Sequence, residues 1–229
     1  LIIMLPKMRI PPASAAARSS GSVWRNLKEG LAFIMHEKVV RTLVLMVGVP
    51  AVFGMPYNTL MPVFARDVLG GGAAEQGLML SAVGLGSLVG ALSLASLSGF
   101  KHKGWLVTAG TVVFSVALIL FSFSRMYWLS LAILPFVGWS MITQMSTTQT
   151  LLQTTVPDHL RGRVMSVHFL MFRGMMPLAG LYGGVTATFF SGLYGVASGA
   201  PLAVTLGAAV CGVVALFVIW RAPYVRRLE

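Results

Sequence analysis

Three polar side chains interrupt long apolar stretches of this 229-residue sequence, and each could do chemistry there: Asn58, Gln144 and Arg173. An amide both donates and accepts hydrogen bonds, and a guanidinium presents a rigid fork of N–H donors to an anion. Such groups are costly against lipid, so they face other helices, an aqueous cavity or the membrane interface. We therefore interpret the three residues as candidates for lining a substrate path between membrane-spanning helices.

Each candidate has an alternative role that the sequence leaves open. Asn58 lies between two prolines and could cap backbone groups that a proline kink frees. Gln144 could instead form a hydrogen bond between helices. Arg173 follows Arg163 by ten residues, roughly 15 Å along a helix, and could extend back to the interface rather than meet an anionic substrate.

A short charged turn, residues 156–163, separates two of the apolar stretches and must lie in water or among headgroups. Its Asp158, Arg161 and Arg163 are candidates for a conformational latch, which engages a neighbouring helix end in one conformation and releases it in another. The alternative is that these charges only set the topology of the chain.

The composition is typical of a membrane protein. The chain is 56% hydrophobic and 10% charged, and its mean hydropathy is +0.83. The net charge of +11 could suggest nucleic acid, but the basic residues lie between apolar runs, where they meet lipid headgroups. We therefore expect a lipid bilayer as partner and no nucleic acid.

Side chains for other chemistry are sparse. All six acidic residues lie in predicted loops or tails, so within the predicted spans a proton relay could use at best His168, whose alternative role is that of an interfacial histidine. No span combines a nucleophile with a base, and the histidines and the single Cys211 lack metal-site spacing. We expect no enzyme activity, no metal and no cofactor.

Six apolar runs near the length of about 20 residues that a span needs predict an all-α membrane protein with a bundle over residues 39–220. The predicted spans cover residues 42–65, 77–98, 105–123, 127–155, 164–190 and 196–220. Glycine pairs four residues apart predict close helix packing at Gly86 and Gly90, Gly180 and Gly184, and Gly195 and Gly199.

The segments outside the bundle differ in character. Residues 1–6 read as the end of a preceding transmembrane helix, 7–22 as a cytoplasmic linker and 221–229 as a cytoplasmic tail. Residues 23–38 predict an amphipathic interfacial helix, because Trp24, Leu27, Leu31, Ile34 and Met35 share one helical face. Of the seventeen Lys and Arg residues, fourteen fall on one side of this topology, two on the other and one within a span, so both ends of the chain are expected in the cytoplasm.

Three motifs extend the interpretation: NLKEGLAFI (26–34), MPVFARDVLG (61–70) and VPDHLRGRVMSVHFLMFRGMMPLAG (156–180). They resemble the major facilitator superfamily, in particular the branch that contains enterobactin exporters and macrolide efflux pumps. The resemblance implies a bacterial inner-membrane location, helices seven to twelve of a twelve-helix fold, and alternating access with a path lined by helices seven and ten. The turn at 99–104 lacks the family's usual acid, so a coupling carboxylate is expected in a missing N-terminal six-helix half.

These observations together predict the C-terminal half of a secondary active transporter. It would be a proton-coupled exporter of small amphiphilic molecules of the drug or siderophore type. Its partners would be the bilayer, the missing half, a small-molecule substrate and protons. The alternative is a non-transport membrane scaffold or partner subunit, or a truncated remnant of such a transporter.

Overall fold

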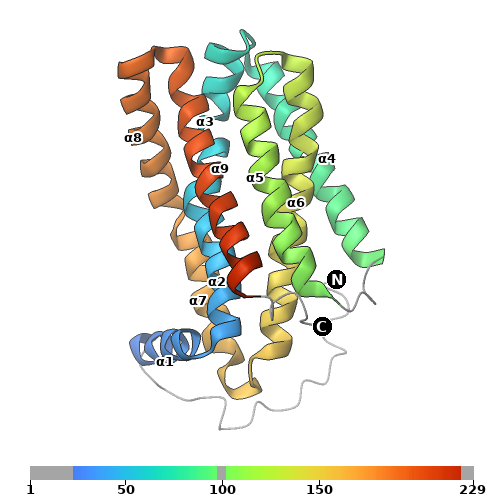
Figure 1. Ribbon diagram of the computed structural model, residues 1–229, viewed down its shortest axis with the longest axis vertical. Coiled ribbons are helices and arrows are strands. Elements are labelled where there is room, and N and C mark those ends of the chain that lie inside the picture. The colour runs from blue at the N-terminus through green and yellow to red at the C-terminus, as the bar shows by residue number, and fades with distance from the viewer. Residues whose placement is uncertain (1–22, 97–101, 223–229) are drawn as a thin grey trace, which may run out of the picture.

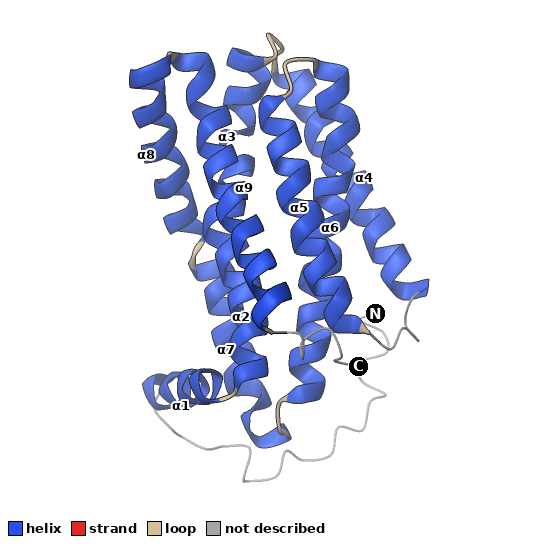
Figure 2. Cartoon of the chain, in the orientation of Figure 1, coloured by secondary structure: helices blue, strands red, loops and turns tan. Residues whose placement is uncertain are grey.

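The computed structural model describes residues 23–96 and 102–222, and this part of the chain is helical throughout, with no strand (Figures 1 and 2). The elements, with η marking π-helical segments, are α1 (Val23–His36), α2 (Lys38–Val49), η3 (Pro50–Gly54), α3 (Pro56–Val63), η4 (Phe64–Val68), α4 (Ala73–Ser96), α5 (Lys103–Phe123), α6 (Tyr127–Thr155), α7 (Asp158–Gly174), α8 (Met176–Tyr194) and α9 (Val196–Arg221).

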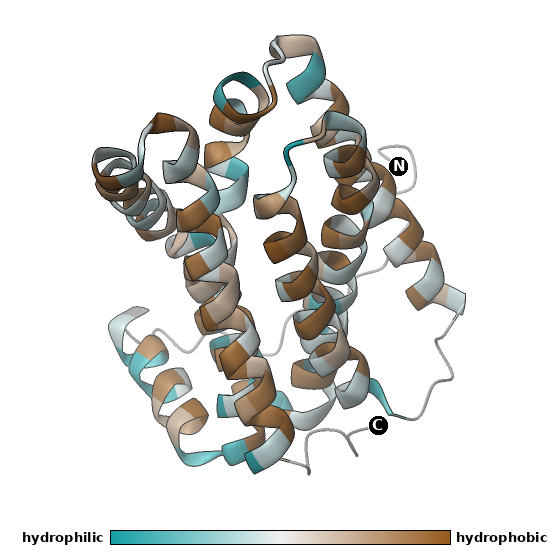
Figure 3. Ribbon diagram, turned by 45° about the horizontal axis from the view of Figure 1, so that its top comes forward, coloured by the Kyte–Doolittle hydropathy of each residue, from teal (hydrophilic) through white to brown (hydrophobic). Residues whose placement is uncertain are grey.

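Six helical segments are long and apolar enough to cross a membrane, which confirms the predicted fold class. They are Lys38–Val68, Ala73–Ser96, Lys103–Phe123, Tyr127–Thr155, Asp158–Tyr194 and Val196–Arg221. Apolar residues cover the middle of the bundle, and hydrophilic ones gather towards its ends (Figure 3). The predictions for residues 1–6 and 7–22, for the tail from residue 223 and for residues 99–101 of the turn at 99–104 lie outside the described residues.

The first span is built from four pieces because prolines interrupt its hydrogen-bond ladder. Pro50 opens the π-helical η3, Pro56 opens α3 and Pro62 lies two residues before η4, so the chain continues in the same direction with three changes of helical type. A proline has no N–H to donate to the carbonyl four residues earlier, and its ring pushes that carbonyl away. The first span is therefore kinked near its middle.

The charged stretch at 156–163 differs from the predicted turn. The chain reverses at Val156 and Pro157, and α7 begins at Asp158, so Arg161 and Arg163 lie on a helix. Proline before the first turn and an acidic side chain within it both favour a helix start. The fifth span, predicted as one kinked helix, is instead interrupted at Met175 between α7 and α8.

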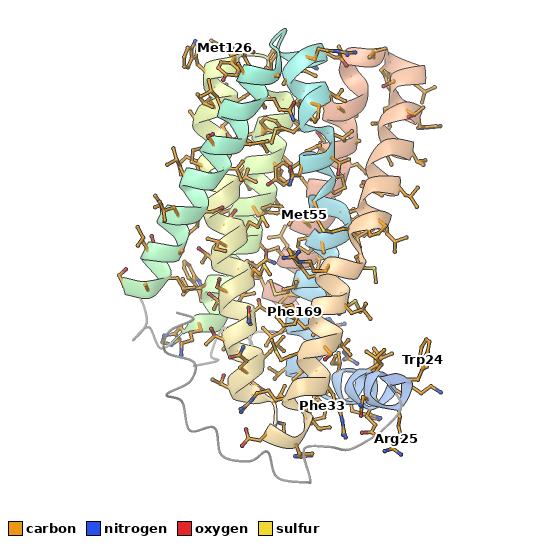
Figure 4. The ribbon with its side chains drawn as sticks, turned by 180° about the vertical axis from the view of Figure 1, so that it is seen from behind. Trp24, Arg25, Phe33, Met55, Met126 and Phe169 are labelled. Atoms are coloured by element: carbon orange, nitrogen blue, oxygen red, sulfur yellow. The ribbon has the colours of Figure 1, made fainter. Side chains whose placement is uncertain are left out.

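The bundle has two layers. Helices α5 and α9 lie side by side at the front in Figure 1, and α4, α6, the first span and α7–α8 are seen from the other side in Figure 4. One apolar cluster, which includes Phe64, Met79 and Phe121, fills the bundle from its middle towards the end away from α1. Another, which includes Val44, Leu152 and Val164, fills the end where α1 lies. We call that end the α1 end; the α6–α7 turn lies there too (Figure 1).

Close contacts are found at both members of one predicted glycine pair, at one member of the second and at neither member of the third. A Cβ on Gly86 would overlap the carbonyl oxygen of Pro135, and one on Gly90 would overlap Ile142, so α4 and α6 touch through backbone. Gly199 packs against the end of α8 in the same way. The remaining glycines behave differently: Gly195 forms the α8–α9 turn with φ +89°, and Gly180 and Gly184 have no atom within 4 Å of an added Cβ.

Helix α1 lies across the direction of the spans, at one edge of the α1 end, and has a side packed on the bundle and a side exposed to the surroundings (Figure 1). Ile34 is buried against the second apolar cluster, with Leu27 packed beside it. The other predicted apolar residues are exposed: Trp24 by 74%, Leu31 by 46% and Met35 by 58%. Trp24 projects to the side of α1 nearer the spans and Arg25 to the opposite side (Figure 4). The single apolar face predicted from sequence is thus divided between the bundle and the surroundings.

The contact between α4 and α6 gives a stability prediction. Replacing Gly86 by Ala forces a methyl group into the backbone of α6 and should destabilise the protein by about 1–3 kcal/mol, as overpacking does. Thermal unfolding in detergent, followed by the loss of the monodisperse peak on gel filtration, measures the effect. Gly84→Ala is the matched control because an added Cβ there meets nothing within 4 Å. Equal unfolding temperatures for the two variants would contradict the close contact.

Candidate functional site

The kink in the first span lies at the centre of the candidate site, because the predicted polar residues gather around it. The Gln144 side chain on α6 is buried and donates an amide N–H to the carbonyl oxygen of Met46 on α2. Met46 precedes Pro50 by four residues, so its carbonyl is the one that Pro50 leaves without a helical partner. Gln144 therefore closes the ladder that Pro50 opens, which is the interhelical role considered for it.

Gln144 also lines a small enclosed cavity of about 20 Å³. Met55, Phe114 and Phe172 are among its other lining residues, so the cavity lies between the first span, α5, α6 and α7. A space of this size holds about one water molecule. Its place on a substrate path stays a prediction, since only the side chain's position and its hydrogen bond are seen.

Asn58 lies on the exposed side of the kink, which is the side that borders a hollow. Its side chain is exposed and lines a hollow of about 190 Å³ together with Met55, Thr59, Met176 and Ala179, between α3 and α8. In the described part of the chain its amide has no hydrogen-bond partner, so it does not cap a freed backbone group in this conformation. Met55, which projects from the middle of the bundle in Figure 4, lines both this hollow and the Gln144 cavity.

Arg173 lies in the last turn of α7 and is exposed. No ion pair with it is found among residues 23–96 and 102–222. Met176, three residues further on, lines the same hollow as Asn58. The structure therefore brings Asn58, Gln144 and the chain at Arg173 to one region, around the interruptions of the first and fifth spans. Asn58 and Arg173 are exposed there, and Gln144 is buried.

The three latch candidates divide between two ion pairs. Arg161 Nη2 lies 2.5 Å from Asp158 Oδ1 within the first turn of α7. Arg163 Nη1 lies 2.5 Å from Glu29 Oε2 on α1, and Arg25 lies 3.7 Å from the other oxygen of the same carboxylate. In this conformation Arg163 thus engages α1, while Asp158 and Arg161 engage each other.

Two members of this site were missed by the sequence reasoning. Glu29 lies on the predicted amphipathic helix of residues 23–38 but was given no role, although its spacing of four residues from Arg25 was a visible signal of a helical pair. Its second partner, Arg163, could not be found without the fold. Gly30 was also missed: a Cβ there would lie 2.9 Å from the carbonyl oxygen of Arg163, so α1 and α7 touch through their backbones.

The rest of the described chain offers little for other chemistry. No group of three or more His, Cys, Asp or Glu side chains in it could hold a metal ion. Cys211 is buried in α9 as a free thiol. The chemistry of the site is therefore that of hydrogen bonding, ion pairing and apolar contact.

The Gln144–Met46 hydrogen bond predicts a coupling between distant residues. Replacing Gln144 by Leu leaves the Met46 carbonyl buried without a partner and should destabilise the protein by about 1–3 kcal/mol. Pro50→Ala restores a backbone N–H, so the same Gln144→Leu change should cost clearly less in that background. Thermal unfolding of the four proteins gives the coupling energy. Gln153→Leu, an exposed amide on the same helix, is the control, and additive effects in the cycle would contradict this role.

Comparison with known proteins agrees with this architecture. The family described as "Transmembrane secretion effector" matches residues 2–222. The chain is 29% identical over 231 residues to the multidrug efflux pump Tap of Mycolicibacterium fortuitum, covering 100% of this chain and 54% of that protein. It is 26% identical over 163 residues to the enterobactin exporter EntS of Shigella boydii serotype 18, covering 71% of this chain and 39% of that protein.

EntS of Escherichia coli O1:K1 gives the same identity and coverage. The chain thus spans about half the length, or less, of the curated relatives that it matches. No solved structure matches. Because the family match covers nearly the whole sequence and the described part has six spans, the chain belongs to the transmembrane secretion effector branch of the major facilitator superfamily.

Proposed function

We propose that this chain acts as the C-terminal six-helix half of a secondary active exporter for small amphiphilic molecules. The exporter works by alternating access and is driven by protons. The observation that carries the proposal is the hollow beside the kinked first span: the exposed Asn58 lines it, and Arg173 lies exposed at the end of α7, three residues before Met176 of the same hollow. The names of the relatives, a multidrug efflux pump and an enterobactin exporter, support export as the direction of transport.

A second six-helix unit is part of the proposal because two spans are poorly covered. Only 22% of the most apolar stretch of α4 and 28% of that of the α7–α8 span is buried within the chain, against 61% for α5. Both spans expose small residues, among them Gly84, Gly180 and Gly184, whose added Cβ would meet nothing within 4 Å. Small residues let helix backbones approach in lipid, so these faces suit another helical unit. The substrate path would then run between the two units, beside the kink.

The membrane orientation belongs to the same proposal. The α1 end carries most of the positive charge of the described chain, including Arg25, Lys28, Arg41, Arg161 and Arg163. Positive loops remain on the cytoplasmic side of bacterial inner membranes, so we place the α1 end and both chain ends in the cytoplasm.

Export can be tested with two compounds of different charge. The native gene product, expressed in a bacterial strain without its own major exporters, should lower the accumulation of ethidium, a lipophilic cation, or of enterobactin. Asn58→Leu and Arg173→Gln should each slow that efflux by about tenfold, which corresponds to the loss of one good hydrogen bond of about 1.4 kcal/mol. Dye fluorescence and siderophore assays in cells, with expression checked by blot, provide the measurement.

Leu120→Ala serves as the control, because Leu120 is exposed on α5, the best-covered helix of the other layer. It should leave efflux unchanged. Unchanged accumulation of both compounds in cells that express the native protein would overturn the exporter proposal. Purification of the protein in a stable complex with another membrane protein would then support the alternative of a scaffold or partner subunit.

We also propose that the charges at the start of α7 form a latch that changes partners during transport. Arg163 engages Glu29 on α1 in the conformation described, and the Asp158–Arg161 pair is available for a different partner in the opposite conformation. An ion pair of this partly exposed kind contributes about 0.5–1 kcal/mol, which suits a contact that must break in every cycle.

The latch predicts matched effects for its two ends. Arg163→Gln and Glu29→Gln should each slow efflux by about threefold, equivalent to about 0.6 kcal/mol, and the double variant should be no slower than either one. Arg25→Gln is the control because Arg25 contacts the same carboxylate from within α1. Efflux at the native rate in all variants, with normal membrane insertion, would leave these charges with a role in topology alone.

A further inference from the structure

The α1 end of the bundle contains one buried acid–base group. His168 on α7 is 0% exposed, and it is the only His, Asp, Glu, Lys or Arg side chain that is buried in residues 23–96 and 102–222. Neither Nδ1 nor Nε2 has a hydrogen-bond partner in the described structure. An imidazole always carries at least one N–H donor, and leaving it unpaired in a buried position is costly. A second environment, in which water solvates the ring, would remove this cost.

Thr148 on α6 lies at the same level as His168. Met145 and Phe172 line the same small cavity, which fixes the register between α6 and α7. The two helices are antiparallel, so one turn towards the α1 end leads from Met145 to Thr148 and from Phe172 to His168. Thr148 is also fully buried, and its hydroxyl likewise lacks a partner in the described part of the chain. Two unsatisfied polar side chains on facing helices thus share one level of the bundle.

No carboxylate in the described structure is free to stabilise a charged imidazole there. Helix α7 packs against α1, α2, η3, α6 and α8. Their titratable or charged side chains are Arg25, Lys28, Glu29 and His36 on α1, Lys38 and Arg41 on α2, none on η3, Tyr127 alone on α6, and Tyr182 and Tyr194 on α8. Glu29, the one acid among them, is bound by Arg163.

The fixed charges on α7 itself also oppose a proton on His168. Arg163 and Arg173 lie five residues to either side, roughly 7.5 Å along the helix axis in each direction. A second cation in these surroundings would be destabilised by both and by the loss of water. In the packed conformation the ring is therefore neutral, and it can be charged only where water reaches it.

The helix that carries His168 can separate from its neighbours as a short unit. Helix α7 ends at Gly174, and Pro177 prevents a continuous ladder into α8, so the interruption at Met175 provides a hinge. At its other end α7 is tied to α1 by the Arg163–Glu29 pair and by the close contact at Gly30. Movement of α1 and α7 together would open the side of α7 that faces α2 and α6.

We propose that His168, with Thr148 at a similar level on α6, is a proton-binding site that fills when α7 moves away from α2 and α6. In the open conformation water enters, and a hydronium ion transfers its proton to the free ring nitrogen and leaves as water. On closing, the imidazolium returns the proton to water before the ring is buried again. The inference rests on the proposed exporter function. Because the proton binds only in the open conformation, a lower pH shifts the equilibrium of the exporter towards that conformation.

The experiment is a pH titration of the native protein in lipid nanodiscs by NMR, with ¹³C at the Cε1 atoms of histidine. The His168 signal is assigned by its loss in His168→Gln, or in His168→Phe if the first variant does not fold. We expect two His168 signals, one neutral and one charged, whose ratio shifts towards the charged form between about pH 8 and pH 5. The exposed His36 and His159 should instead move continuously, as solvated histidines do. A His168 signal that stays neutral down to about pH 5, while His36 and His159 become charged, would overturn the proposal.

A second measurement separates this site from the exporter proposal. In proteoliposomes loaded with ethidium or enterobactin, His168→Gln should keep substrate exchange at about pH 8 on both sides but lose the change in rate that lowering both sides to about pH 5 gives to the native protein. His159→Gln, on the exposed start of α7, should retain it. Charged His168 in the NMR titration together with no transport by the native protein would contradict export and leave the proton site standing. A native pH dependence of exchange in His168→Gln would contradict the site and leave export standing.

Discussion

The hydrogen bond from Gln144 to the Met46 carbonyl shows the constraint on which this bundle depends: inside a membrane, every backbone polar group needs a partner from the protein itself. Pro50 bends the first span but removes the donor for Met46. A side chain 98 residues away supplies the replacement, so the bend and the packing of α6 against α2 require each other. The hollow beside Asn58 lies at the same bend. Its position is therefore linked to the position on α6 from which Gln144 can donate to the Met46 carbonyl.

A similar arrangement occurs at the end of the bundle away from α1. Pro201 lies four residues after Ala197 in α9, and Arg125 Nη1, from the α5–α6 loop, donates to the Ala197 carbonyl at 3.3 Å. A charged loop residue thus takes the place of the missing proline N–H. Both prolines disturb a helix at a point where another segment of the chain arrives with a donor. The interruptions therefore help to specify which helices lie together.

Much of the architecture could be predicted from the sequence because length and hydropathy alone determine what can cross a bilayer. The fourth span, Tyr127–Thr155, was predicted to the residue, and prolines signalled the kinks. The partners could not be predicted, since Gln144 meets Met46 and Arg163 meets Glu29 only after folding. The start of α7 was misjudged because its charges suggested a solvated turn, whereas Asp158 and Arg161 satisfy each other on the helix surface.

The position of α1 also has a mechanical consequence. Its exposed Trp24, Leu31 and Met35 form a row that suits the boundary between headgroups and acyl chains, while Gly30 holds its other side against the backbone of α7. A helix held in this way cannot tilt or sink without pulling on α7. Lateral tension or a change of curvature in the surrounding leaflet would therefore act directly on the fifth span. Conversely, any movement of α7 would displace α1 and deform the lipid around it.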